Sequence, residues 1–149
     1  MRLPAFTLIG LDLGRKTTNE GGQSGIDCGS LWQKFEKENI AEKIPGKTGN
    51  EIYAAYFAYE GDHTRPFSYF IGCKVQPDSK IPQGLNSLKI PEQEYIKVVA
   101  SGKMPDCISN AWIDIWRSDI KRAHQFDFEM YDERSRNWEE AEVDIFLSV

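Results

Sequence analysis

A segment near the C-terminus carries acidic side chains in a setting that could bind a cation. Between residues 125 and 132, strict alternation places Asp127, Glu129 and Tyr131 on one face of a strand and Phe126, Phe128 and Met130 on the other. If both faces are covered, Glu129 is a carboxylate facing the interior, which is unfavourable by several kcal/mol unless a cation or hydrogen-bond donors compensate it. The alternative is a solvated acidic face.

Two tryptophans lie on one face of a segment with helical periodicity. Trp112, Ile115 and Trp116 are spaced at i, i+3 and i+4, so they share the face that turns toward a sheet or a pocket. Aromatic rings at such a position can line a ligand site. The other interpretation is ordinary core packing, because large rings on an amphipathic helix fill volume.

The charge distribution indicates which partners are disfavoured. The net charge is −5, and residues 127–144 contain eight acidic residues against two arginines. Such a surface repels phosphate backbones, and no basic stripe with interleaved aromatics offsets it. We therefore expect no direct nucleic-acid binding, and cations are the favoured partners.

The residue types that carry metal sites or covalent catalysis are sparse. Cys28, Cys73 and Cys107 form no CxxC pair, and His63 and His124 form no HxxxH or HExxH spacing. We expect free thiols, no metal, no cofactor and no assigned catalytic residue. Binding without chemistry is favoured over enzymatic activity.

The length and hydropathy favour one domain. The 149 residues are 40% hydrophobic, enough for one core without disulfides. No run approaches the roughly 18 apolar residues of a membrane span, and the N-terminus lacks a leader-like apolar region. We expect one domain over residues 1–149, no membrane association and a cytoplasmic location.

The elements that position these side chains form a pattern that occurs twice. The first half predicts a strand at 3–11, a helix at 26–39 and a hairpin of strands at 51–59 and 67–75. Residues 77–91, rich in Pro and Gly, predict a connector. The second half predicts a strand at 94–100, a helix at 106–118 and strands at 126–131 and 143–149.

This repetition predicts an α+β fold built by duplication. Two strand-helix-strand-strand units, about 3–75 and 92–149, would form one antiparallel sheet with both helices on one face. The seam between the units is a natural concave binding site.

Five short motifs, in this order, resemble the GyrI-like effector-binding domain, the ligand-sensing domain of AraC-type and MerR-type multidrug regulators. They are Gly72-Cys73-Lys74-Val75, Ile90-Pro91, the Ala111-Trp112 to Ile115-Trp116 segment, the 127–132 segment, and Asp144-Ile145-Phe146-Leu147-Ser148-Val149. The resemblance runs from about residue 5 to the C-terminus. Members also exist as stand-alone bacterial proteins, some of them on mobile integron cassettes.

The resemblance implies a ligand class and a set of site residues. The family's fold is the same tandem duplication, with a hydrophobic pocket at the seam where a buried glutamate among aromatics receives lipophilic cations. The glutamate position falls on Glu129, with Tyr131 two residues on. The aromatic candidates by face and position are Trp112, Trp116, Tyr53, Tyr69 and Phe146.

Several functions stay open at this level. A helix-turn-helix attachment would need roughly 50 to 100 further residues, so direct DNA contact is not expected of this domain. A free sensor, a drug-sequestering protein, a homodimer or a subunit that regulates a protein partner are alternatives. So are a hydrolase of strained or electrophilic compounds, with the glutamate as general base, and an inhibitor of another enzyme.

Overall fold

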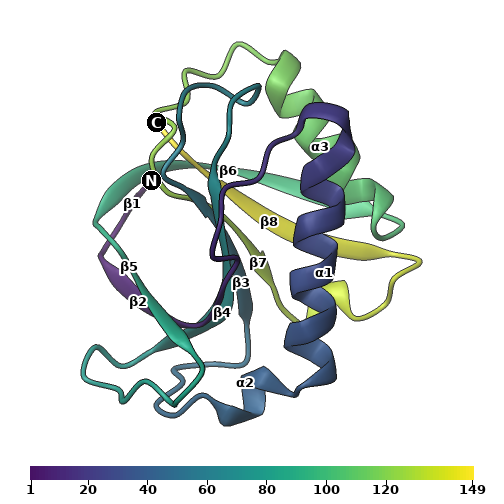
Figure 1. Cartoon of the computed structure of the whole chain (residues 1–149). Helices are drawn as coiled ribbons and strands as arrows, with labels where there is room; N and C mark the ends of the chain where they lie inside the picture. The colour runs from purple at the N-terminus through teal and green to yellow at the C-terminus, as the bar shows by residue number, and fades with distance from the viewer.

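Eight strands in one antiparallel sheet and two longer helices make up the computed structural model, which describes residues 1–149 (Figure 1). The strands are β1 (Arg2–Leu3), β2 (Phe6–Asp12), β3 (Ile52–Phe57), β4 (Ser68–Val75), β5 (Asn86–Ile90), β6 (Gln93–Gly102), β7 (Asp127–Tyr131) and β8 (Ala141–Ser148). The helices are α1 (Gln23–Lys37), α2 (Ile40–Lys43) and α3 (Asp106–Arg117), with short 3-10 turns η1 (Glu20–Gly22) and η2 (Glu133–Ser135).

The strand order confirms the predicted duplication. The sheet runs β1-β6-β8-β7-β3-β4-β2-β5. Each half contributes three strands in the same spatial order, β3-β4-β2 from the first and β7-β8-β6 from the second. Each half also places its long helix between its first and second strands. The two units join through β3 and β7, which are neighbours at the centre of the sheet.

The leading strands of the two halves are exchanged. Strand β1, which precedes β2 in the chain, pairs with β6 of the second half, and β5, which precedes β6, pairs with β2 of the first half. Each half therefore completes the sheet edge of the other. The sheet curls into a half-barrel. Its two edge strands, β1 and β5, lie at the left of Figure 1, where short connections join β1 to β2 and β5 to β6.

Apart from shifts of a few residues at the ends of elements, two predicted elements were wrong. The strand predicted at 3–11 is divided into β1 and β2, with Pro4 and Ala5 between them, since proline cannot donate a ladder hydrogen bond. The connector predicted at 77–91 contains β5. The five residues of β5 pair with β2, and this long-range pairing stabilises a strand in a stretch whose prolines and glycine indicate a loop.

Both long helices cover the same face of the sheet, at the right of Figure 1, as the repeat predicted. Helix α1 buries Leu31 and Phe35 against the β2 and β4 side, and α3 buries Trp112 and Ile115 against the β6 and β8 side. None of the helices is long and apolar enough to span a membrane. The three cysteines are unpaired.

The opposite face, inside the half-barrel, is filled by a separate aromatic cluster. Phe128 of β7 stacks on Phe146 of β8, with ring centroids 4.7 Å apart, and Tyr95 packs edge-on against Phe128. Tyr53 and Phe70 complete this side. The sheet is thus buried on both faces, which is why a side chain on either face of β7 lies in the interior.

Two glycines face each other where the neighbouring strands β2 and β4 approach closely. Gly10 pairs with Gly72, and a Cβ on Gly10 would lie 2.0 Å from the carbonyl oxygen of Ile71. A Cβ on Gly72 would lie 2.5 Å from the carbonyl oxygen of Ile9. The contacts are with backbone, which cannot rotate away, so the close approach requires glycine at both positions.

We predict that Gly72→Ala destabilises the protein by about 1–3 kcal/mol, as overpacking does, because the strands must separate. Gly29 of α1, which has open space around its Cβ position, is the matched control. Gly29→Ala should stabilise the helix by roughly 0.5–1 kcal/mol. Urea unfolding of both variants measures the difference. Equal effects at the two positions would contradict the steric argument.

Candidate ligand-binding site

The buried carboxylate lies at the centre of the sheet, on the face that the helices cover. Glu129 of β7 pairs with Ala54 of β3 on one side and with Ile145 of β8 on the other. Ala54 contributes only a methyl group beside the carboxylate, so larger side chains from β3 and α3 have room to reach it. Glu129 is 1% exposed.

Three neutral donors hold the carboxylate. Tyr56 of β3 and Trp112 of α3 donate to Oε2, at 2.7 and 2.6 Å, and Tyr131 of β7 donates to Oε1 at 2.5 Å. No lysine, arginine or histidine forms an ion pair with Glu129 among the contacts within 4.0 Å. The negative charge is therefore hydrogen-bonded but has no positive partner in the chain.

Burial sets the protonation of this cluster. Desolvation raises the pKa of Glu129, and the hydrogen bonds from Tyr131, Trp112 and Tyr56 oppose that rise. Burial, followed by the charge of Glu129, raises the pKa of Tyr56 and Tyr131, so both hydroxyls keep the protons that they donate.

More rings surround these donors. Tyr69 of β4 lies edge-on to Tyr56, with centroids 5.0 Å apart, and its hydroxyl accepts a hydrogen bond of 2.8 Å from Nε1 of Trp32. Trp32 in turn packs edge-on against Tyr131 at 4.9 Å. Helix α1 thereby closes the side of the cluster opposite α3.

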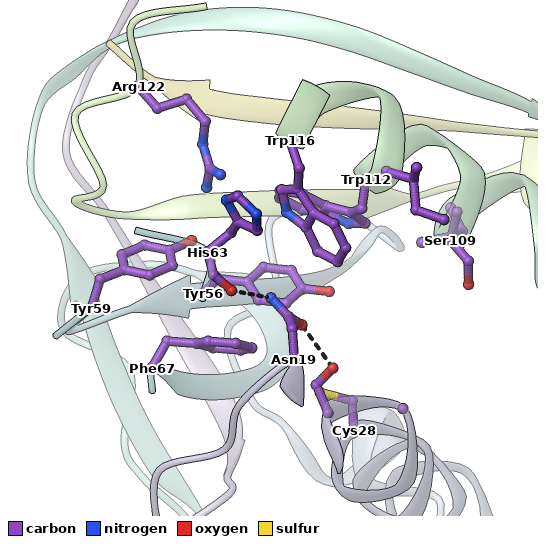
Figure 2. Close-up of a pocket in the computed structure, with 14 residues that line it drawn as sticks. Asn19, Cys28, Tyr56, Tyr59, His63, Phe67, Ser109, Trp112, Trp116 and Arg122 are labelled. Atoms are coloured by element: carbon purple, nitrogen blue, oxygen red, sulfur yellow. Dashed lines mark hydrogen bonds between the residues drawn. The ribbon is translucent and has the colours of Figure 1, made fainter. Parts of the chain in front are cut away.

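A cavity of about 240 Å³ opens directly above this cluster, between α1 and α3 (Figure 2). Tyr56 and Trp112 form part of its wall, so the two rings lie between the cavity and Glu129. The complete lining is Asn19, Ser24, Gly25, Cys28, Tyr56, Tyr59, His63, Phe67, Ile108, Ser109, Trp112, Ile113, Trp116 and Arg122.

The loop between β3 and β4 reaches over the cavity. The imidazole of His63 stacks on Trp116, with centroids 5.1 Å apart and ring planes 9° from parallel. The amide of Asn19 donates to the carbonyl oxygen of His63 at 2.9 Å, as the dashed line in Figure 2 marks. These contacts tie the loop to the segment before α1 and to the end of α3.

A second buried carboxylate lies two residues before Glu129 on the same face. Asp127 accepts from the backbone and hydroxyl of Ser148 through Oδ1, and from Tyr59 through Oδ2. Arg122 forms an ion pair with Oδ2 at 2.7 Å. Asp127 therefore differs from Glu129 in having its charge neutralised by a cation of the protein.

The seven residues expected from the sequence fall into three groups. Trp112 and Trp116 line the cavity. Glu129, Tyr131 and Tyr69 form the hydrogen-bonded aromatic layer beneath its wall. Tyr53 and Phe146 pack on the other face of the sheet, in the cluster inside the half-barrel, and line no part of this cavity.

Several lining residues were missed, each for an identifiable reason. Alternation along 51–59 places Tyr56 on the face opposite Tyr53, and that face is the one that Glu129 shares. The same alternation groups Tyr59 with Tyr53, but Ala58 adopts a positive φ of 51°, which redirects the chain and turns Tyr59 to the cavity. His63 and Arg122 come from loops, where no periodicity indicates a direction.

Comparison with known proteins identifies the family. The sequence model described as "Cass2: Integron-associated effector binding protein" matches residues 1–149, the whole chain. The chain belongs to the Cass2 family. This agrees with the resemblance to GyrI-like effector-binding domains that the motifs carry.

Solved structures and a curated relative extend the comparison of this Cass2-family protein. The Vibrio cholerae integron cassette protein VCH_CASS2 is 26% identical, covering 100% of this chain and 93% of that one, with a TM-score of 0.73. The structure of SAV2435 bound to tetraphenylphosphonium has a TM-score of 0.78 at 18% identity, covering 100% and 91%. The transcriptional regulator BrlR of Pseudomonas aeruginosa is 25% identical over 98% of this chain, which spans only 53% of BrlR.

Burial of Glu129 predicts a pH-dependent difference in stability. Its pKa is raised in the folded state above 4.5, so folding shifts Glu129 toward the protonated form relative to the unfolded chain. That contribution to stability is fully present below pH 4.5 and is lost as the pH rises through the raised folded value. Glu129→Gln removes the titration.

The free energy of unfolding of Glu129→Gln, relative to the unmodified protein, should therefore increase with pH above 4.5. The increase should be about 1.4 kcal/mol for each unit by which the pKa is raised. Urea unfolding at a series of pH values measures it, with the exposed Glu140→Gln as control. A difference that is flat with pH, or that falls, contradicts the assignment.

Proposed function

We propose that this Cass2-family protein binds a lipophilic organic cation in the cavity between α1 and α3 and does not transform it. The observation that carries the proposal is the contrast between two buried carboxylates on one strand face. Asp127 is paired with Arg122, whereas Glu129 is held only by neutral donors. A bound cation is the missing counter-charge for Glu129.

The wall of the cavity suits such a ligand. Tyr56 and Trp112 present their rings to the cavity while their O–H and N–H groups donate to Glu129. A donor that is hydrogen-bonded to a carboxylate is polarised, which makes its ring a better partner for a cation. Each cation–π contact contributes about 0.5–2 kcal/mol once desolvated. The carboxylate thus attracts the ligand through the rings as well as directly.

Size and shape favour planar ligands in the form that the cavity has here. Its volume of about 240 Å³ lies just below the roughly 300–1,000 Å³ of sites that enclose drug-sized molecules. A planar cation of two fused rings fits this volume and can stack on Trp116. A bulkier cation, such as the tetraphenylphosphonium bound by SAV2435, requires His63 and Trp116 to move apart.

The roles of the predicted residues follow from their positions. Trp112 and Trp116 contact the ligand, and Glu129 supplies the charge. Tyr131 and Tyr69 position the carboxylate and the ring of Tyr56. We assign no ligand contact to Tyr53 or Phe146, which lie beyond the sheet.

The geometry favours binding over hydrolysis by the same glutamate. A general base needs a free lone pair within hydrogen-bond reach of the attacking water. Glu129 is 1% exposed and lies behind the rings of Tyr56 and Trp112, so its oxygens are out of reach of a water in the cavity. The arrangement holds the carboxylate as a fixed charge.

The cellular role that fits this site is sensing or sequestration of a small molecule. The chain aligns with about half of the regulator BrlR, so its ligand response would be transmitted through a further domain or a partner protein. The net charge of −5 disfavours DNA as that partner.

Titration of two isosteric ligands tests the proposal. N-methylquinolinium and 1-methylnaphthalene have the same shape, and only the first is charged. Glu129→Gln should raise the dissociation constant of N-methylquinolinium by about ten-fold or more, because a charge-assisted interaction contributes on the order of 1.5–3 kcal/mol. The dissociation constant of 1-methylnaphthalene should change by less than about two-fold.

Glu140→Gln removes the same charge from an exposed position and should leave both ligands unaffected. Isothermal titration calorimetry measures the dissociation constants. The proposal fails if Glu129→Gln weakens both ligands equally, or if the unmodified protein does not prefer the cation.

A further inference from the structure

Arg122 is a buried cation beside the cavity whose hydrogen-bonding capacity is largely unused. It comes from the loop between α3 and β7, and its side chain is 6% exposed. A guanidinium carries five N–H donors. One of these donors, on Nη2, binds Oδ2 of Asp127 at 2.7 Å.

The neighbouring side chains do not satisfy the whole group. Nε of Arg122 is buried and has no acceptor in the chain. Asp127 uses Oδ1 for both donors of Ser148 and Oδ2 for Tyr59 and Arg122. Neutralising Asp127 thus engages Nη2 and leaves Nε, a donor of a charged group, without a partner in a desolvated place, which is unfavourable.

The guanidinium faces the ligand cavity. Arg122 is one of the residues that line it, and its guanidinium carbon lies 5.5 Å from the ring centroid of Trp112 and 5.9 Å from that of Tyr59. Figure 2 shows the side chain descending from its loop toward Tyr59 and His63. The wall of the cavity therefore carries a fixed positive group as well as the rings above Glu129.

These two charges make the cavity chemically asymmetric. A ligand cation is attracted toward Glu129 and repelled from Arg122, so it has one preferred orientation. The part of the ligand that reaches Arg122 meets terminal N–H groups of the guanidinium that do not bind Asp127, for which a carbonyl or carboxylate oxygen is the complementary group. An apolar part at that position would leave those donors unpaired.

We propose that Arg122 is a specificity-determining residue that donates hydrogen bonds to an oxygen acceptor of the ligand. The preferred ligand class is then a planar aromatic cation with a carbonyl or carboxylate oxygen remote from the positive charge. This inference rests on the proposed function for the cation, while the role of Arg122 toward the acceptor is testable without it.

Ligand pairs of equal shape isolate the acceptor. N-methylquinolinium bearing a ring carboxamide is compared with the same compound bearing an isopropenyl group, which has the carboxamide's shape but no oxygen. The pair is repeated on neutral naphthalene, with each substituent placed at each ring position. In the unmodified protein, the best carboxamide should bind about ten-fold tighter than its isopropenyl partner, as expected for a hydrogen bond to a charged donor.

Two variants separate recognition from ion-pair structure. Asp127→Asn keeps Arg122 and should retain the ten-fold preference. Arg122→Met combined with Asp127→Asn removes both charges together, so that no buried carboxylate is left unpaired. It should reduce the preference to less than two-fold, and circular dichroism and thermal unfolding verify that each variant is folded.

The inference is overturned if carboxamides show no advantage at any ring position, or if their advantage persists in the double variant. The two scaffolds distinguish the failures. If the carboxamide is preferred on naphthalene but the protein shows no preference for the quinolinium charge, the proposed cation binding is wrong and the role of Arg122 stands. If the cation is preferred but the carboxamide is not, only the role of Arg122 is wrong.

Discussion

The uncompensated carboxylate of Glu129 determines how the centre of the molecule is built. A buried carboxylate is tolerated only when donors surround it, and here they come from three elements that meet at the seam of the two halves. Tyr56 comes from β3, Trp112 from α3 and Tyr131 from β7. Each ring is therefore oriented by its polar atom as well as by packing. The rings hold fixed positions before any ligand arrives, so they need little reorganisation to bind one.

The same strand shows why side-chain alternation could predict part of the site and not the rest. Alternation in 125–132 correctly separates the acidic face of β7 from the phenylalanine face, and both faces are buried. Alternation does not reveal which face of the partner strand β3 the helices cover. The sequence therefore offered Tyr53 as a site residue, whereas Tyr56, on the opposite face, lines the cavity. Nor does it distinguish Asp127 from Glu129, since Arg122 lies in a loop that has no periodic signal.

The fold itself was predictable to a greater extent. The doubled pattern, the positions of both long helices and the hairpin of β3 and β4 follow from local periodicity and agree with the structure. What local patterns lack is information about distant pairing. Strand β5 lies in a stretch that reads as a loop, and the glycine pair of β2 and β4 reflects a close approach that only the assembled sheet imposes.

The exchange of leading strands has a consequence for synthesis in the cell. Arg2 of β1 pairs with Glu94 of β6, so during synthesis β1 has no partner until β6 has also been made. Contacts this distant in sequence form slowly, because the intervening chain must first be ordered. In the meantime, the first half exposes the edge of β3 that β7 later covers. The nascent chain should therefore be vulnerable to aggregation until the second half emerges, and the two halves should complete their folding together.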